Sequence, residues 1–115
     1  MSLLSDQELF SQNVATLIIY IFGKGYKCTF GEAWRSHEQA VIYAKSGKGI
    51  VDSQHCKRLA IDLNLISPKG ELLTNSADYE LFGVFWEKLC KNNEWGGRWK
   101  HRIDGNHFQM NETKT

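Results

Sequence analysis

Hydrophobic residues recur along this chain with two different spacings, and these spacings divide it into helices and strands. Near the N-terminus the spacing is helical and predicts a helix from Ser5 to about Phe22. Ser5 and Glu8 have the three-residue separation of a capping box, and Gly23 is placed to end the helix. The apolar positions of this helix are Leu9, Phe10, Val14, Leu17, Ile18 and Ile21.

Two shorter segments also have helical features. Ser36 and Gln39 repeat the capping-box pattern, which predicts a short helix that runs through Lys45 and is closed by Gly47. Apolar residues at helical spacing predict a third helix over roughly residues 76–91. The apolar positions of this third helix are Leu81, Val84, Phe85 and Leu89.

Alternation of apolar and polar residues over positions 59–65 is the clearest strand signal. Leucine and isoleucine side chains point to one face, while Asp62 and Asn64 point to the other. Two shorter strands are predicted at 26–30 and 107–110.

The remaining segments are predicted as loops and turns. Residues 48–57 and 95–99 are expected to be loops, and 67–70 a turn. Helices and strands are mixed with few crossovers, so the chain is predicted to be an α+β domain with a small antiparallel sheet and flanking helices.

Composition limits the classes of protein to consider. A chain of 115 residues with 42% hydrophobic residues fits one domain, residues 1–115, and we expect a monomer. The formal net charge of +1 gives no support to a nucleic-acid partner. Three cysteines without a C-x-x-C pair favour neither a disulfide framework nor a thiolate metal site. The N-terminus lacks the pattern of a signal peptide, and no apolar run is long enough for membrane insertion, so we expect synthesis in the cytoplasm.

The polar face of the predicted central strand carries the first candidate chemistry. His55 precedes Asp62 by seven residues, in a loop that is free to fold back toward the same face. Asp104 and His107 form a second pair across a turn, beside the last strand. A catalytic zinc needs three histidine or carboxylate ligands and an open position. A single Asp on a strand is more often hydrogen-bonded at a sheet edge, and an Asp in a turn is common without any catalytic role.

In combination these residues resemble peptidase family M15, the zinc D-Ala-D-Ala carboxypeptidases and L-alanyl-D-glutamate endopeptidases, which include small phage endolysins. The resemblance covers about residues 30–109 in the same order. Two positions depart from the common pattern: Arg58 stands where many members have Gly, and Asp104 where many have Glu. The matching segments are Trp34-Arg35-Ser36-His37-Glu38-Gln39, Ser53-Gln54-His55-Cys56-Lys57-Arg58-Leu59-Ala60-Ile61-Asp62 and Asp104-Gly105-Asn106-His107.

The resemblance implies a Hedgehog/DD-peptidase-like fold and a role for each matching residue. Zn²⁺ would be held by His55, Asp62 and His107. Asp104 would act as general base and then protonate the leaving amine. Arg35 would bind a substrate carboxylate or the developing oxyanion.

Three further positions near this constellation are less specific. Ser53 would touch substrate or support the metal loop, and a local turn hydroxyl fits it nearly as well. Trp95 is predicted to contact substrate, because the glycines beside it would let the backbone approach a ligand. His101 is a weaker substitute for His107 as a ligand, because it does not adjoin the last strand.

The activity expected from this resemblance is zinc-dependent hydrolysis of a peptide bond in the stem peptides of bacterial peptidoglycan. A phage endolysin-type L-alanyl-D-glutamate endopeptidase is preferred, acting on the cell wall after release from the cytoplasm. The alternatives are a D-Ala-D-Ala carboxypeptidase and a non-catalytic, zinc-stabilised peptidoglycan-binding module. A nucleic-acid-binding domain that uses Arg98, Lys100 and Arg102 is the least favoured.

Overall fold

The computed structural model describes residues 2–50 and 52–113, and its elements alternate between helix and strand. The three α-helices, four strands and three 3₁₀ turns are α1 (Leu3–Gly23), β1 (Lys27–Phe30), α2 (His37–Lys45), η1 (Gln54–Lys57), β2 (Ala60–Ile66), η2 (Ser76–Tyr79), α3 (Glu80–Leu89), β3 (Asn93–Trp95), η3 (Gly96–Arg98) and β4 (His107–Met110). Among the described residues, no helix is both long and apolar enough to span a membrane.

The four strands form one open antiparallel sheet in the order β1-β2-β4-β3. The α+β class with a small antiparallel sheet is therefore confirmed. The central strand β2 pairs with β4 so that Ile61 lies opposite Phe108 and Asp62 lies opposite His107. This register gives the sheet one apolar face and one polar face.

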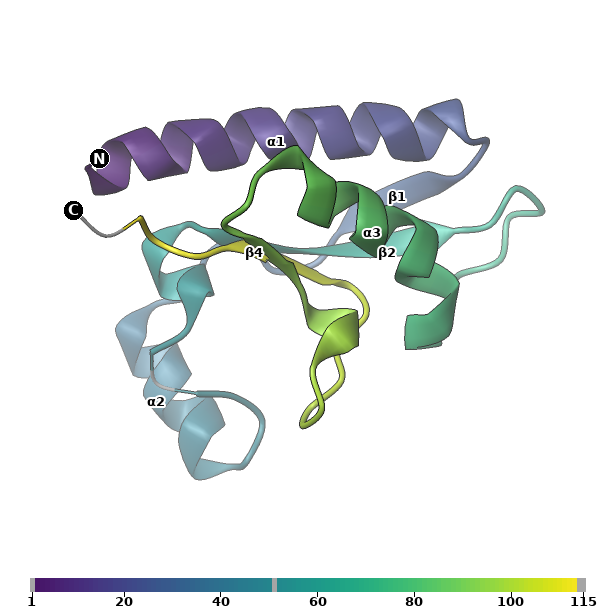
Figure 1. The fold of residues 1–115 in the computed structure, drawn as a ribbon. Helices are drawn as coiled ribbons and strands as arrows, with labels where there is room; N and C mark the ends of the chain where they lie inside the picture. Colours follow the sequence, from purple (N-terminus) through teal and green to yellow (C-terminus); the bar gives the residue numbers. More distant parts are fainter. Residues whose placement is uncertain (1, 51, 114–115) are drawn as a thin grey trace.

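The apolar face of the sheet is covered by two helices. α1 and α3 lie together on one side of the sheet, and α2 stands on the other side (Figure 1). Between the sheet and the helices α1 and α3 lies a core in which the alternating residues of β2 are almost completely buried, as the sequence pattern predicts. The core residues are Phe10, Leu17, Ile21, Leu59, Ile61, Leu63, Leu65, Tyr79, Phe82, Trp86, Trp95, Phe108 and Met110.

The start of α1 differs from the prediction. The N-cap is Ser2, whose hydroxyl accepts a hydrogen bond from the Ser5 backbone N–H, so Ser5 lies inside the helix. Asp6 lies in the first turn, and its buried carboxylate accepts hydrogen bonds from the backbone N–H and hydroxyl of Thr113. This contact attaches the C-terminal segment to α1. The cap of α2 is as predicted, with the Ser36 hydroxyl accepting from the Gln39 N–H.

The segment after α3 also corrects the sequence prediction. The helix predicted over 76–91 begins as the turn η2 and ends at Leu89, and Asn93–Trp95 forms the edge strand β3. Asn93 supplies a physical reason, because its side-chain amide donates to the Trp86 carbonyl near the end of α3 and directs the chain back along β4. The predicted loop at 48–57 contains the turn η1, and position 51 lies outside the described residues.

Trp95 belongs to the core and does not line the cleft that holds the other predicted site residues, so its contact with substrate stays a prediction. Its side chain is 3% exposed, and its indole N–H donates to the Gly105 carbonyl. The nearby glycines make room for the indole: a Cβ added to Gly83 or to Gly97 would lie 2.1 Å from a ring carbon of Trp95. These glycines therefore allow the tryptophan to pack closely against its neighbours.

We predict that Gly83→Ala destabilises the fold. The new methyl group would overlap the Trp95 indole, and overpacking of a closed core costs about 1–3 kcal/mol. The free energy of unfolding in urea, followed by tryptophan fluorescence, measures this cost. Gly23→Ala is the matched control, because nothing lies within 4 Å of the added Cβ. Equal stability of the two variants would contradict this account of the core.

Candidate active site

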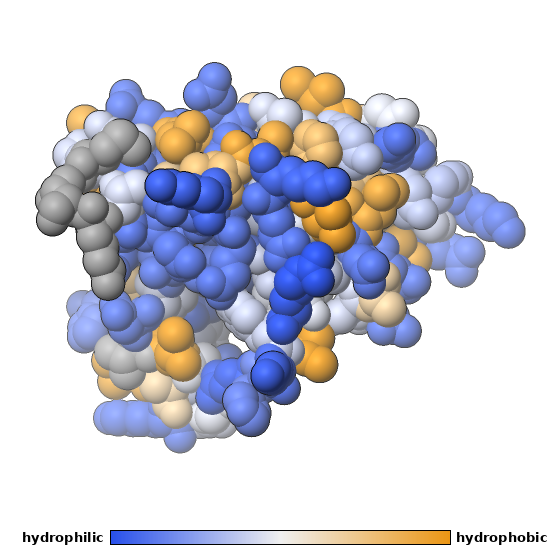
Figure 2. All heavy atoms as spheres, in the orientation of Figure 1, coloured by the Kyte–Doolittle hydropathy of each residue, from blue (hydrophilic) through white to orange (hydrophobic). Residues whose placement is uncertain are grey.

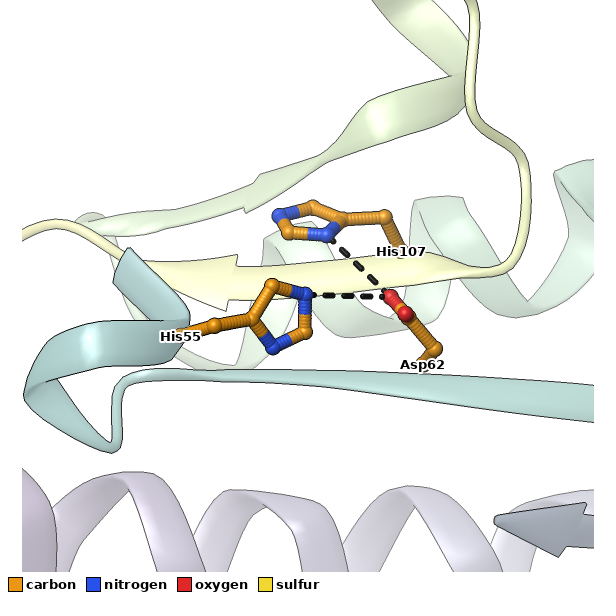
Figure 3. A group of neighbouring side chains, drawn as sticks. All are labelled: His55, Asp62 and His107. Carbon is orange, nitrogen blue, oxygen red and sulfur yellow. Dashed lines mark hydrogen bonds and ion pairs between the residues drawn. The ribbon is translucent and has the colours of Figure 1, made fainter. Parts of the chain in front are cut away.

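The pairing of β2 with β4 brings two predicted metal ligands together. Asp62 and His107 are directly opposite in the antiparallel register, so their side chains leave the same face of the sheet. Asp62 Oδ1 lies 3.3 Å from His107 Nδ1. Figure 3 shows both side chains and that of His55 converging from β4, β2 and the turn before β2.

His55 reaches this cluster from η1. Ser53 caps the turn, because its hydroxyl accepts a hydrogen bond from the His55 backbone N–H at 3.1 Å. Arg58 ends the turn in the left-handed conformation, with φ 58°. The turn folds the chain back, so His55 Nε2 lies 3.3 Å from Asp62 Oδ1. Ser53 thus supports the loop that carries His55, and it also lines the adjoining cleft, where a contact with substrate stays a prediction.

The separations within the cluster suit a tetrahedral metal site. One ligand atom from each of His55, Asp62 and His107 lies within 4.8 Å of the others. Zinc bonds of 2.0–2.1 Å place tetrahedral ligand atoms about 3.3 Å apart, which matches both distances to Asp62. Two imidazole nitrogens and one carboxylate oxygen are also the donor set of many catalytic zinc sites. The residues present therefore fit Zn²⁺.

A closed network of side chains orients His107. The ring Nε2 pairs with Gln109 Oε1 at 2.7 Å, which leaves Nδ1 directed at Asp62. Gln109 donates to Asn111, and Asn111 donates to Glu94. Trp99 closes the network, since its indole N–H donates to Glu94 at 2.6 Å and its ring lies 4.8 Å from the His107 ring.

Burial and neighbouring groups shift the pKa values of Asp62 and His107. Burial alone would raise the pKa of Asp62, but hydrogen bonds from His107 and His55 and their charges outweigh it and lower this pKa to about 2. Burial works to lower the pKa of His107, but Asp62, Gln109 and the Asp104 charge raise it. A metal ligand must be a neutral imidazole, so the raised pKa of His107 makes metal binding weaker as the pH falls.

Asp104 is held beside the cluster by its own backbone. Its N–H donates to the Gly96 carbonyl at 3.1 Å, and its carbonyl accepts from the His107 N–H at 3.2 Å. Gly96 allows this approach, because an added Cβ would lie 2.3 Å from the Asp104 carbonyl oxygen. Burial, aided by the Asp62 charge, raises the pKa of the Asp104 carboxyl, while His107, His55 and Arg35 oppose the shift. A carboxylate with a raised pKa is a stronger base.

Arg35 enters the same site from the segment before α2. Its side chain is 13% exposed and forms an ion pair with Glu32, while its guanidinium lies 4.9 Å from the centre of the Tyr43 ring. Its backbone N–H donates to the His55 carbonyl at 3.3 Å. These contacts hold the positively charged Arg35 guanidinium at a cleft that His55, Asp62 and His107 also line.

The cleft is about 550 Å³ in volume, and all the predicted site residues except Trp95 line it. The same cleft contains residues that sequence reasoning missed, among them Lys48, Trp99 and Arg102. On the face drawn in Figure 2, hydrophilic residues cover most of the surface and hydrophobic ones form small separate groups. His101 also lines the cleft but is not part of the metal cluster, which agrees with its lower rank.

Comparisons with known proteins agree with this fold. The family model described as D-alanyl-D-alanine carboxypeptidase, of peptidase family M15, matches residues 46–110, which is more than half of the chain. The crystal structure of the Serratia marcescens L-Ala D-Glu endopeptidase ChiX matches with a TM-score of 0.62 and 26% sequence identity, covering 74% of this chain and 67% of that one. Among curated proteins, none matches this chain. The chain belongs to peptidase family M15.

We predict that His55→Ala loses the metal. Two protein ligands hold zinc much less tightly than three. The His55 ring is buried, so a water molecule could take its place as a ligand only if the site rearranged. Metal per chain after dialysis, measured by atomic emission, should approach one for the wild type and fall to near zero for the variant. His37→Ala is the control, since His37 is exposed at the start of α2 and should retain zinc. Full retention by His55→Ala would refute the ligand assignment.

Proposed function

We propose that this protein is a zinc-dependent endopeptidase that hydrolyses the L-alanyl-D-glutamate bond in stem peptides of bacterial peptidoglycan, as an endolysin of phage type. The observation that carries the proposal is the meeting of His55, Asp62 and His107 in one cleft with Asp104 and Arg35. Family membership and the likeness to an L-Ala D-Glu endopeptidase support a peptidase of this substrate class.

The residues of the cleft divide the chemistry of peptide hydrolysis between them. Zinc held by His55, Asp62 and His107 would supply a Lewis acid that polarises the scissile carbonyl and makes water nucleophilic near neutral pH. Asp104 takes the proton from the attacking water, and its raised pKa favours this transfer. The same carboxyl then gives the proton to the departing nitrogen.

Arg35 supplies the positive charge on the substrate side. Its guanidinium is fixed by Glu32 and by the Tyr43 ring, so it offers directed N–H donors without first losing much side-chain entropy. It would bind either a substrate carboxylate or the oxygen that becomes negative in the transition state. Fixed donors of this kind stabilise the transition state because they need no reorganisation during the reaction.

A D-Ala-D-Ala carboxypeptidase is the second candidate, and the description of the matching family model favours it. Both reactions need the same metal ligands and base, so the difference lies in how the cleft holds the substrate. A carboxypeptidase must bind the terminal carboxylate of the stem peptide, for which Arg35 is also suited. The likeness to an endopeptidase structure leads us to prefer internal cleavage.

A zinc-stabilised binding module without catalysis would use the same three ligands. It would have no need for a buried carboxyl with a raised pKa beside them, nor for a fixed arginine. Asp104 and Arg35 therefore favour the enzyme. The proposal places its action at the cell wall after release from the cytoplasm, since the proposed substrate is located there.

We predict that the zinc-loaded protein releases stem-peptide fragments from purified peptidoglycan. Mass spectrometry of the digest distinguishes the candidates: new L-Ala and D-Glu termini indicate the endopeptidase, and loss of only the terminal D-Ala indicates the carboxypeptidase. Zinc binding without any release, across several wall types, would instead support the binding module.

We predict that Asp104→Ala binds zinc normally but loses activity by roughly 10²–10⁴-fold, the usual contribution of a general base. The metal ligands remain intact, so only proton transfer is lost. Hydrolysis rates at equal metal content measure the effect. Asp52→Asn is the matched control, because this exposed acid lines the same cleft and is given no catalytic role. Unchanged turnover in Asp104→Ala would remove Asp104 from the mechanism.

A further inference from the structure

The ring nitrogen Nδ1 of His55 is buried and has no hydrogen-bond partner among the described residues. The side chain is 2% exposed, and its other nitrogen, Nε2, is directed at Asp62. When Nε2 binds a metal, Nδ1 must carry the ring proton. A buried N–H without an acceptor is unfavourable, and the ring is too well covered for bulk solvent to supply one.

Glu32 is the acidic residue that faces this nitrogen. Its Oε1 lies 3.9 Å from His55 Nδ1, and the same oxygen accepts a hydrogen bond from Arg35 Nε at 2.7 Å. The first distance exceeds a hydrogen bond by about 1 Å, an adjustment within the reach of a Glu side chain that is 26% exposed. The carboxylate has lone pairs enough to accept from both groups.

The backbone holds Glu32 against the metal ligands. The Glu32 carbonyl accepts from the Asp62 N–H at 2.9 Å, and the Gly31 N–H donates to the Asp62 carbonyl at 2.7 Å. The fit is close, because a Cβ on Gly31 would lie 2.9 Å from the Asp62 Cβ. Arg35 in turn donates its backbone N–H to the His55 carbonyl. The segment from Gly31 to Arg35 is therefore joined to two of the three ligands.

We propose that Glu32 is a positioning residue that serves both halves of the site: its carboxylate accepts the Nδ1–H of His55 and the Nε–H of Arg35, and so orients a metal ligand and the substrate arginine together. This inference rests on the proposed zinc site. Metal-bound histidines generally donate their second ring N–H to a carboxylate or carbonyl, and loss of that partner weakens metal binding by about 10–100-fold. One carboxylate would then contribute separately to metal affinity, through His55, and to the orientation of Arg35.

Zinc affinity, measured by competition with a chromophoric chelator, tests the His55 half of the proposal. Glu32→Ala should weaken binding by about 10–100-fold. Glu32→Gln should lose less, because its amide keeps an acceptor oxygen. Arg35→Ala should not weaken binding, which separates the loss of the Glu32 contact to His55 from loss of the ion pair. Glu38→Gln is the matched control, an exposed glutamate of α2 outside the cleft.

Two readouts that a merely structural role would not produce complete the test. In the zinc-loaded protein with ¹⁵N-labelled histidine, the His55 Nδ1–H should give a slowly exchanging resonance that disappears in Glu32→Ala and persists in Glu38→Gln. At saturating zinc, Glu32→Ala should lower kcat/KM, and the double variant with Arg35→Ala should be no slower than Arg35→Ala alone.

The outcomes separate this proposal from the proposed function. If the wild type binds no zinc, the zinc site and this inference fall together. If the wild type binds zinc and Glu32→Ala binds it equally well, only the role of Glu32 is overturned. Should Glu32→Ala fail to fold, as circular dichroism would show, Glu32→Leu takes its place, because leucine keeps much of the side-chain volume and has no acceptor. Zinc affinity equal to that of the wild type in Glu32→Leu would then overturn the proposal, and a loss of about 10–100-fold would support it.

Discussion

Antiparallel pairing places Asp62 of β2 opposite His107 of β4, and both sides of the sheet depend on that register. On one side the pairing aligns Ile61 with Phe108, within the core that α1 and α3 cover. On the other side it sets a carboxylate beside an imidazole. A shift of one residue would exchange the two faces, burying the charged groups in the core and exposing the aliphatic ones. The hydrophobic core therefore determines the positions of Asp62 and His107, two of the proposed metal ligands.

The polar face has to compensate for burying several ionisable groups in a small space. Hydrogen bonds from two imidazoles stabilise Asp62 as a carboxylate, while burial of Asp104 outweighs the charges of the same imidazoles and raises its pKa. Two acids in one cleft thus acquire opposite properties: one is kept charged, as a metal ligand requires, and the other is a better proton acceptor. The hydrogen-bond network from Gln109 to Trp99 orients the His107 ring, since it fixes which ring nitrogen faces Asp62.

Sequence patterns predicted the parts of this arrangement that repeat regularly. The alternation of β2 predicted its buried face, and the family resemblance of the segments around His55, Asp62 and His107 predicted that these three side chains cluster. The same alternation applied to β4 would have found Gln109, which follows His107 by two positions and shares its face. The packing of Trp95 could not be predicted in the same way, because flanking glycines suit a ligand and a packed indole equally well, and the indole packs against Gly83, twelve residues earlier.

Arg58 shows how the turn that carries His55 tolerates a side chain where many family members have glycine. Its φ of 58° costs a residue with a Cβ about 1–2 kcal/mol. The guanidinium lies 5.1 Å from the centre of the Trp34 ring, and such an exposed contact returns about 0.5–1 kcal/mol. The next residue, Leu59, is completely buried, which contributes about 1.5–3 kcal/mol more and requires the chain to turn at this point. Core packing beside the turn therefore outweighs the strain at Arg58 and keeps the His55 loop in the conformation that glycine would adopt.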